Sequence, residues 1–406
     1  MAKTKCIGRS SQNEVNASDF FDPLSPTCGI NEAIAELRGR GGRVRIPAGQ
    51  WRLARSIYVP RGVSLVGDGP STQIQVKCLK TALLSKDVRK GGRVLTLKKQ
   101  APFEVGQQIG VSGNLRVGLR ATHGLVERVV GGRVWLSSGF SHTLSVRDKA
   151  RAVSLFPAIT AEGETDLQVM DLSIVGPDAR SSKWWDYTFS GVHFVDCRRV
   201  RIANVSVLRW ASDGISVQRG SDVQVTHCQV HDCRGHGYHP GSGLGRSIWS
   251  SNIAKGNVGD GFYFCARVHH CVCSDNVFNE NGQNGIGGVG SGGDHHNVIS
   301  NNVCAYNQQW GIDAFEGGEQ VVTGNIVLSN SRRKRGAYGA IRLHDMQHAL
   351  VQGNRCGDDQ KQPSQTRGIV ESGNSDHNLI SGNLCVGTQQ AVTVTGPHSL
   401  AEANLV

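Results

Sequence analysis

The amino-acid sequence predicts an all-β chain that folds as a right-handed parallel β-helix, a solenoid of about ten rungs. The first observation is a repeat of 23 to 29 residues in which asparagine returns at one position of each unit. Periods of this length are typical of stacked-repeat architectures. The second observation is a glycine followed by alternating apolar residues in each unit, as in Gly214-Ile215-Ser216-Val217. Leucine or alanine at the spacing that helical repeats need is absent.

The repeat is clearest between Asn252 and Gly311, where the pattern N-x4-N-x3-G occurs three times. The leading asparagine of successive units stands at Asn252, Asn276, Asn302, Asn325, Asn354 and Asn383. Stacked amides hydrogen-bond from rung to rung and satisfy backbone groups in turns, so we interpret this column as structural. Cys304, Cys356 and Cys385 each follow two residues later, in a column where we expect small buried thiols. Since neighbouring strands are only about 4.8 Å apart, a Cys356–Cys385 bridge is an alternative.

Two segments precede the main repeats. Residues 1–28 are polar and irregular, and we expect an N-terminal arm. Residues 29–79 are predicted to form a capping helix and the first β-helix rungs. The helix has one apolar face, made of Ile30, Ala33, Ile34 and Leu37. Gly39 then ends it.

Residues 80–157 break the rhythm of the chain. Two alternating strands flank Gly131-Gly132, which is a strong hairpin signal because glycine adopts positive φ freely. We therefore predict a small inserted β-subdomain, with an elaborated set of rungs as the alternative. Residues 158–406 are predicted to form the main parallel β-helix, which carries a substrate groove.

The charge of the chain favours an anionic partner. The formal net charge is +11 and the isoelectric point about 9.2, which suits nucleic acid, a membrane surface or an acidic polysaccharide. No stretch is long and apolar enough to span a membrane, and the numbered chain shows no signal peptide. The basic residues are scattered and form no known nucleic-acid-binding module. An acidic polysaccharide is therefore the expected partner, and no feature of the sequence indicates an oligomeric state.

Strand alternation predicts which side chains face outward. The residue after the signature glycine points inward and the next points outward. One outward strip gathers imidazole, phenol, carboxylate and guanidinium groups, at His193, His236, His239, Tyr263, Asp260, Asp313, Glu316, Arg342 and His344. These groups suffice for acid–base chemistry on a sugar acid. A polar sheet face enriched in histidine by chance is the alternative.

The strip suggests a reaction at C5 of a uronate. A cation such as Arg342 or Arg209 would neutralise the carboxylate, His239 would take the C5 proton, and Tyr263 or a second histidine would donate one. That sequence is β-elimination, and return of the proton to the opposite face is C5-epimerisation. The candidate catalytic residues are His239, Tyr263, His236, His193, Asp260 and Asp313. The candidate substrate-binding residues are Arg342, Arg209, His344, Glu316, Trp184 and Trp185, the last two as exposed sugar-stacking rings or as a packed loop anchor.

The start of the chain resembles the opening of the pectate-lyase-like superfamily. That opening comprises a capping helix, a strand of the form GG-x-V-x-IP-x-G and a V-x-L-x-G-x-G turn. Here the strand reads GGRVRIPAG and the turn VSLVGDG. The resemblance implies the β-helix fold and identifies a superfamily rather than an activity.

Residues 236–262, HGYHPGSGLGRSIWSSNIAKGNVGDGF, resemble the catalytic stretch of the alginate C5-epimerases. In that family Y-G-x-D-P-H-[DE] is followed about two dozen residues later by D-G-F. The D-G-F triplet matches at residues 260–262, whereas His236 and His239 replace the Tyr and Asp, and Gly241 replaces the catalytic His. The resemblance implies a polysaccharide lyase or uronate C5-epimerase that is secreted to the periplasm or the extracellular space. Calcium is a candidate cofactor because it is common in related lyases.

Two other functions are open. Asp213 and Asp260 stand two rungs apart, roughly 9.6 Å, near the upper end of the 6.5–9.5 Å or so that inverting glycosidases use. With Asp313 they could form an inverting glycoside hydrolase. A non-catalytic glycan-binding β-helix is the second alternative.

One further histidine column precedes the repeat asparagines by six residues. It holds His270, His296, His348 and His377, with Glu319 in the same register. One such residue per turn is typical of a turn preference, and no metal ligand is assigned.

Overall fold

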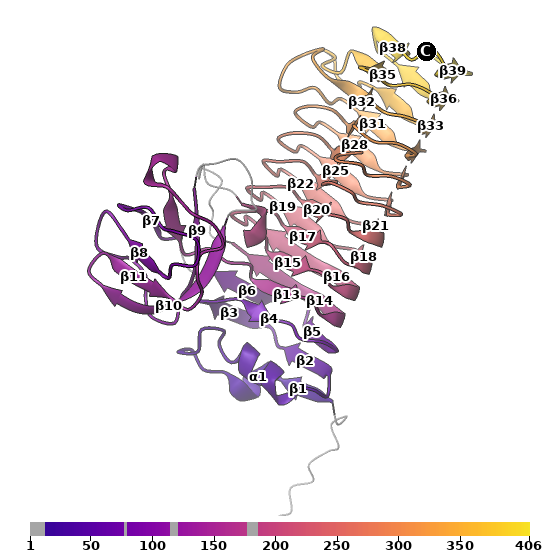
Figure 1. Ribbon diagram of the computed structural model, residues 1–406. Helices are drawn as coiled ribbons and strands as arrows, with labels where there is room; N and C mark the ends of the chain where they lie inside the picture. Colours follow the sequence, from indigo (N-terminus) through magenta and orange to yellow (C-terminus); the bar gives the residue numbers. More distant parts are fainter. Residues whose placement is uncertain (1–12, 77–78, 114–120, 177–185) are drawn as a thin grey trace, which may run out of the picture.

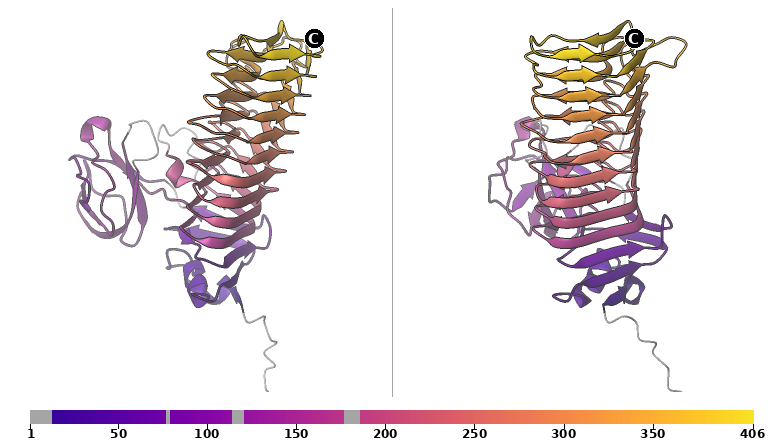
Figure 2. Two further views of the ribbon diagram at one scale, coloured as in Figure 1. Left: turned by 45° about the vertical axis from the view of Figure 1, so that its right-hand side comes forward. Right: turned by 90° about the vertical axis from the view of Figure 1, so that its right-hand side faces the viewer.

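The structure is a computed structural model that describes residues 13–76, 79–113, 121–176 and 186–406. The chain coils as a parallel β-helix, with the N-terminal elements at one end and the C-terminus at the other (Figure 1). Strands of successive turns lie directly above one another, so each turn forms one rung (Figure 2). The predicted fold class is confirmed.

One face of the coil is an eleven-stranded parallel sheet. Its central strands, β15 to β29, follow the signature glycine, and their register follows the predicted columns, with His193 beside Ser216 and Ser216 beside His239. The strands are β4 (Ile57–Tyr58), β13 (Ile159–Glu162), β15 (Val192–Val195), β17 (Ile215–Gln218), β20 (Tyr238–Gly241), β23 (Phe262–Tyr263), β26 (Ile286–Val289), β29 (Ile312–Phe315), β32 (Gly339–His344), β35 (Arg367–Ser372) and β38 (Gln390–Thr393).

The remaining faces are a twenty-two-stranded sheet. The long strand β16 pairs with both β18 and β19 of the next rung, which makes this sheet continuous around a corner. The strands are β1 (Glu14–Asn16), β2 (Gly42–Ile46), β3 (Gly49–Leu53), β5 (Val63–Gly67), β6 (Thr72–Val76), β14 (Thr165–Val175), β16 (Arg198–Leu208), β18 (Ser221–Thr226), β19 (Gln229–His231), β21 (Gly245–Ser250), β22 (Ile253–Lys255), β24 (Val272–Ser274), β25 (Val277–Asn279), β27 (Val298–Ser300), β28 (Val303–Ala305), β30 (Val321–Thr323), β31 (Ile326–Leu328), β33 (Leu350–Gln352), β34 (Arg355–Gly357), β36 (Leu379–Ser381), β37 (Leu384–Val386) and β39 (Leu400–Glu402).

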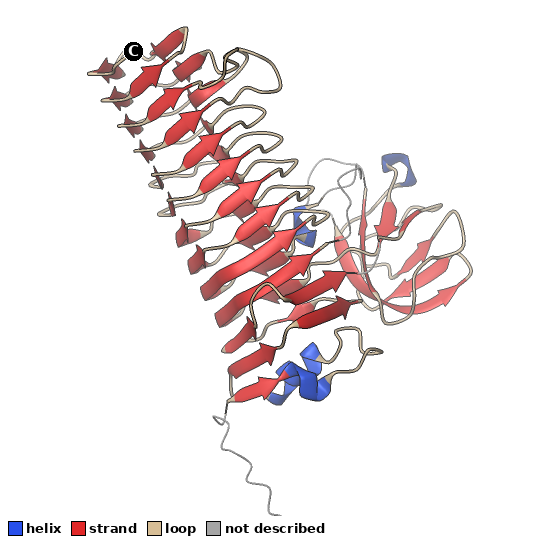
Figure 3. Ribbon diagram, turned by 180° about the vertical axis from the view of Figure 1, so that it is seen from behind, coloured by secondary structure: helices blue, strands red, loops and turns tan. Residues whose placement is uncertain are grey.

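A separate six-stranded sheet interrupts the early rungs. Strand β4 pairs directly with β13, although about a hundred residues separate them in sequence. Six of the strands between them pair antiparallel in a sheet of their own, which projects from the coil (Figure 3). They enclose their own apolar core. They are β7 (Thr81–Leu83), β8 (Val94–Thr96), β9 (Gln108–Ser112), β10 (Thr122–Val130), β11 (Arg133–Leu136) and β12 (Arg151–Val153), with the short helix η2 (Val146–Asp148). We call this unit the inserted subdomain.

Helix α1 (Ile30–Glu36) covers the first rung and buries Ile30, Ala33 and Ile34. It begins after Gly29, where a Cβ would stand 1.9 Å from the Phe20 carbonyl oxygen, so only glycine fits. The short helix η1 (Ala17–Phe20) packs beside it. Among the described residues, no helix has both the length and the apolar character that a bilayer crossing requires.

The asparagine column is structural, as predicted. The buried Asn302 amide donates to the Cys273 carbonyl at 2.9 Å and to Asn325 Oδ1 at 3.0 Å, while its own Oδ1 accepts the Asn276 backbone N–H. Each asparagine thus joins three rungs. Cysteines 304, 356 and 385 are buried free thiols, although Cys356 and Cys385 lie side by side in register.

Candidate active site

His239 lies at the centre of the candidate site, on β20. Its ring is buried, and Nδ1 lies 2.7 Å from Oδ2 of Asp213, a carboxylate without solvent exposure. The other carboxylate oxygen of Asp213 accepts the backbone N–H of His236 at 2.7 Å. Asp213 therefore fixes both the orientation and the tautomer of the His239 ring.

Asp213 and His239 form a buried ion pair of carboxylate and imidazolium below the sheet surface. Burial alone would lower the pKa of His239, but the Asp213 carboxylate and the nearby Cys265 thiol outweigh it and raise that pKa to about 9. Burial opposes ionisation of Asp213, yet the hydrogen bond from His239 leaves its pKa below the usual value. Nε2 of His239 is buried and has no hydrogen-bond partner among the described residues. The imidazolium N–H at Nε2 is therefore a buried donor that the described side chains leave unsatisfied.

Two tyrosines flank His239. The ring centroids of Tyr187 and Tyr263 each lie 5.2 Å from that of His239, and both phenols are partly exposed. Burial is the main cause that raises the pKa of Tyr187 to about 12, and it also raises the pKa of Tyr263. Both phenols remain protonated at neutral pH and can donate hydrogen bonds.

A second histidine–aspartate pair lies one strand further along. The His236 ring stacks on Tyr263, with 4.4 Å between centroids and 10° between planes. Its Nδ1 accepts the backbone N–H of Asp260 at 2.9 Å. The Asp260 carboxylate accepts both the backbone and the side-chain N–H groups of Asn284. This pair supports the Tyr263 ring from beneath.

The inserted subdomain reaches the site through a residue that sequence reasoning missed. His123, on β10, packs on Phe189 at 4.2 Å, and its Nε2 lies 3.2 Å from Oγ1 of Thr188. Burial lowers the pKa of His123 to about 4. Burial, together with the neighbouring His123 and His239, lowers the pKa of His193 to about 3. His193 is therefore neutral where His239 is charged.

The short helix η3 (Tyr187–Phe189) positions one of the two flanking tyrosines. Asp186 caps it by accepting the backbone N–H of Thr188 at 3.0 Å, and the Asp186 carbonyl accepts the Ser212 hydroxyl at 2.5 Å. Burial raises the pKa of Asp186 to about 7. The Asp-x-Thr cap was the available sequence signal, although it does not reveal that Tyr187 turns toward His239.

Asp313 and Arg342 form a separate pair. Arg342 donates to Asp313 from Nε at 2.5 Å and from Nη2 at 3.0 Å, and its guanidinium lies 5.7 Å from the Trp310 ring centroid. Four strand steps separate β20 from β32, roughly 19 Å at about 4.8 Å per step. The structure does not bring Arg342 or Asp313 to His239.

The other predicted binding residues are dispersed. Nδ1 of His344 lies 3.0 Å from the Ser372 hydroxyl, and Glu316 is exposed just after β29. Arg209 is exposed after β16, which belongs to the larger sheet, so it does not line the eleven-stranded face. Trp184 and Trp185 lie outside the described residues.

The outward strip is less open than the sequence predicts. Its members His193, His236, His239, Asp260 and Asp313 are all buried. Neighbouring outward side chains bond to one another and, around His193 and His239, the Tyr187 ring covers them. The groups are therefore desolvated, which strengthens their mutual electrostatic interactions.

The donor set does not suit calcium. Calcium takes six to eight oxygen ligands, whereas the groups around His239 are imidazoles and phenols. The nearby carboxylates of Asp213 and Asp260 already accept N–H donors. We therefore assign no step to calcium.

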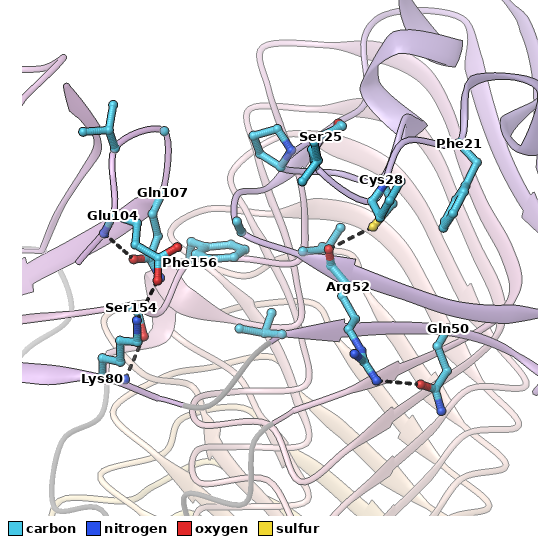
Figure 4. Close-up of a pocket in the computed structure, with 18 residues that line it drawn as sticks. Phe21, Ser25, Cys28, Gln50, Arg52, Lys80, Glu104, Gln107, Ser154 and Phe156 are labelled. Atoms are coloured by element: carbon cyan, nitrogen blue, oxygen red, sulfur yellow. Dashed lines mark hydrogen bonds and ion pairs between the residues drawn. The ribbon is translucent and has the colours of Figure 1, made fainter. Parts of the chain in front are cut away.

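The structure also has a cleft between the N-terminal end and the inserted subdomain, about 520 Å³ in volume (Figure 4). Lys80 and Glu104 form an ion pair at 3.0 Å on one side, and the Cys28 thiol donates to the Arg52 carbonyl on the other. None of the candidate catalytic residues lines this cleft.

Comparison with known proteins defines the class as a right-handed parallel β-helix. A family described as "Right handed beta helix region" matches residues 178–293. The A-module of mannuronan C-5 epimerase AlgE4 from Azotobacter vinelandii superposes with a TM-score of 0.62 at 17% identity, covering 96% of this chain and 100% of that one. The AlgE6 A-module from the same organism gives 0.59 at 15% identity, over 96% and 98% of the two chains.

A phage protein shares the same architecture. The enzymatically active domain of bacteriophage CBA120 tailspike protein 2 superposes with a TM-score of 0.60 at 10% identity, covering 91% of this chain and 47% of that one. No curated protein matched this sequence. At these identities, the similarity establishes the fold.

Proposed function

We propose that this protein processes a uronate-containing polysaccharide by moving the C5 proton, as a lyase or a C5-epimerase. The observation that carries the proposal is the buried Asp213–His239 pair between two protonated tyrosines. Similarity to proteins named as mannuronan C-5 epimerases supports the same substrate class. Structural similarity to the periplasmic alginate epimerase AlgG, with a TM-score of 0.54 at 12% identity over 97% of this chain and 82% of that one, supports a periplasmic or extracellular location.

The charge of His239 assigns its role. A uronate C5–H is acidified when its carboxylate is neutralised, and the His239 imidazolium supplies a fixed positive charge in desolvated surroundings. With a pKa of about 9, His239 is almost fully protonated at neutral pH and has no free nitrogen to accept a proton, so we reassign it from proton acceptor to electrostatic partner and acid. Groups whose pKa values are pushed apart in one site mark acid and base roles.

The remaining proton transfers fall to neutral groups. His193 has its pKa lowered to about 3 and stays neutral, so it is the unprotonated imidazole of the cluster and a weak base for the C5 proton. Tyr263, a protonated phenol stacked on His236, can donate one to the leaving oxygen or to the opposite face of C5. In elimination, the C5–H and C4–O bonds break and a C4–C5 double bond forms. In epimerisation, the C4–O bond stays and a proton returns to C5.

Hydrolysis by the Asp213, Asp260 and Asp313 carboxylates is less well supported. Asp213 is bound to His239, Asp260 to Asn284 and Asp313 to Arg342. Each of these carboxylates already accepts a hydrogen bond from the chain, whereas a general acid or base needs a free oxygen within reach of substrate or water. Glycan binding without turnover needs no charged histidine beneath the surface.

The test is a panel of polyuronates and glycosaminoglycans incubated with the purified protein in heavy water. Ultraviolet absorbance of a C4–C5 double bond identifies a lyase, and deuterium at C5 without that absorbance identifies an epimerase. New reducing ends without either signal identify a hydrolase. Binding to a polysaccharide with none of the three products identifies a non-catalytic binder and contradicts the proposal.

Three variants locate the chemistry. Tyr263→Phe and His239→Gln are each expected to lower kcat at least about a hundredfold, the usual size of an acid–base contribution. Tyr306→Phe is the matched control, since its phenol donates to Asp359 outside the cluster. Equal losses in all three variants would mean that the cluster has no special role in the reaction. Circular dichroism and thermal unfolding would show whether any loss of activity comes from a loss of fold.

A further inference from the structure

A row of histidines runs along one corner of the coil, outside the proposed active site. Parallel backbone bridges join His269 to His295 and His295 to Gly318, and continue through Gln347 to Asp376. The residues of successive rungs therefore stack at the corner that follows the eleven-stranded sheet. The ring planes of His270 and His296 are parallel within 4°, with centroids 5.1 Å apart. We call this row the corner ladder.

One station of the corner ladder has the geometry of a metal site. It consists of His295, His296 and Glu319, whose ligand atoms all lie within 4.8 Å of one another. Nδ1 of His296 lies 2.7 Å from Nδ1 of His295 and 3.1 Å from Oε2 of Glu319. The side chains of His296 and Glu319 are about half exposed, so an ion can reach them.

These spacings match those of a bound transition metal. Zinc binds imidazole nitrogen at about 2.0–2.1 Å and carboxylate oxygen at about 2.0–2.2 Å, so two ligands of one tetrahedral ion stand roughly 3.3 Å apart. The observed 2.7 and 3.1 Å are shorter than this by about 0.6 and about 0.2 Å, so the His295 and His296 rings must separate slightly to bind an ion. Two imidazoles with one carboxylate form a ligand set that suits zinc, copper or nickel rather than calcium or magnesium.

A second station of the same composition lies nearer the C-terminus, at Asp376, His377 and His398. Oδ2 of Asp376 is 2.8 Å from Nδ1 of His398 and 3.3 Å from Nδ1 of His377. The other carboxylate oxygen accepts the backbone N–H groups of both histidines, which holds the carboxylate in place. Such supporting hydrogen bonds are typical of metal ligands.

A turn preference does not account for the pairing of these histidines with carboxylates. His296, Glu319 and His377 all have left-handed backbone conformations, with φ between 55° and 57°. Asparagine and glycine fit that conformation at least as well, and other corner positions use them, such as Asn301 and Gly324. Imidazoles paired with carboxylates at two stations therefore point to a ligand.

We propose that the corner ladder binds two divalent transition-metal ions of the zinc class, one at His295–His296–Glu319 and one at Asp376–His377–His398. Each ion joins residues from neighbouring rungs that only the folded coil brings together. Bound metal therefore stabilises the solenoid against unfolding. This proposal is independent of the reaction at His239.

The test measures zinc stoichiometry of the full chain by equilibrium dialysis with elemental analysis, after chelator treatment. We expect two ions per chain, and one ion in each of the double variants His296→Asn/Glu319→Gln and His377→Asn/His398→Asn. Asparagine removes the imidazole, and at positions 296 and 377 it keeps the left-handed backbone conformation. The matched control is His227→Asn, an exposed left-handed residue on another corner, which should still bind two.

Thermal unfolding provides the second readout. Zinc should raise the Tm of the wild type, and the increase should be smaller in each double variant. Absence of bound zinc in the wild type, or two ions retained in both double variants, overturns the proposal. A loss of zinc in His227→Asn equal to that in the double variants would show adventitious binding only.

Discussion

Nδ1 of His239 lies 2.7 Å from Oδ2 of Asp213, and neither side chain is appreciably exposed. A buried charge pair is costly to break, because removal of one partner leaves the other desolvated and uncompensated. The pair arises from register alone. Asp213 stands two residues before β17, and His239 lies on β20, the adjacent strand.

Asp213→Asn should lower the pKa of His239 from about 9 to below its ordinary value, because burial remains while the carboxylate is gone. In the wild type, the stabilisation from this raised pKa is complete below the unfolded value near 6.5. It is lost as pH rises toward 9, by about 3 kcal/mol in total. Denaturant unfolding between neutral and alkaline pH should show this fall in the wild type only. Identical alkaline slopes in both proteins would contradict it.

Two other histidines should govern how the free energy of unfolding changes at acidic pH. The folded protein holds His193 and His123 neutral, with pKa values lowered to about 3 and about 4. Below about pH 6.5 these histidines are protonated in the unfolded chain but stay neutral in the folded chain. The free energy of unfolding therefore falls by up to about 1.4 kcal/mol per pH unit for each histidine. His193→Gln should flatten the slope between about pH 4 and 6.5. The exposed His142→Gln is the control, and an equal effect there would remove the explanation.

The periodic parts of the molecule were predictable, and the contacts made by irregular segments were not. Counting from each signature glycine placed His193, Ser216 and His239 in one column, and the register confirms it. The burial of that column could not be predicted, because it depends on Tyr187 and on His123 of the inserted subdomain. No local period links such residues to the sheet.

For the corner histidines, the sequence period identified the column but not its function. The column was recognised in the sequence, but one position per turn gave no reason to prefer a ligand site over a turn preference. His295 lies one position before the column and His398 outside its register. Their approach to His296 and Asp376 emerged only in three dimensions.

Asn302→Ala should destabilise the coil by at least about 3 kcal/mol. Its Oδ1 accepts the backbone and side-chain N–H groups of Asn276, and its Nδ2 donates to the Cys273 carbonyl. Several buried groups would therefore lose their partners. Asn404→Ala is the matched control, since Asn404 makes equivalent bonds at the end of the column where water can replace them. Denaturant unfolding measures the difference. Equal losses would mean that the column is not held by buried amides.

Arg342→Gln should raise KM for long substrates and leave kcat nearly unchanged. The Arg342 side chain is 29% exposed beside Trp310, on the same sheet as His239 but four strands away. A chain bound along the sheet would meet Arg342 several sugars from the bond being processed, at roughly 19 Å. Oligosaccharides too short to span that distance should therefore be processed equally well by the wild type and the variant.

Steady-state kinetics over a series of chain lengths gives the measurement. Arg355→Gln, an exposed arginine on the larger sheet, is the charge-matched control and should change neither constant. If Arg342→Gln lowers kcat on the shortest substrates, the guanidinium acts at the reacting sugar and the distance argument fails. If KM rises only for long chains, the eleven-stranded face binds the polysaccharide along its length, and one chain contacts both His239 and Arg342.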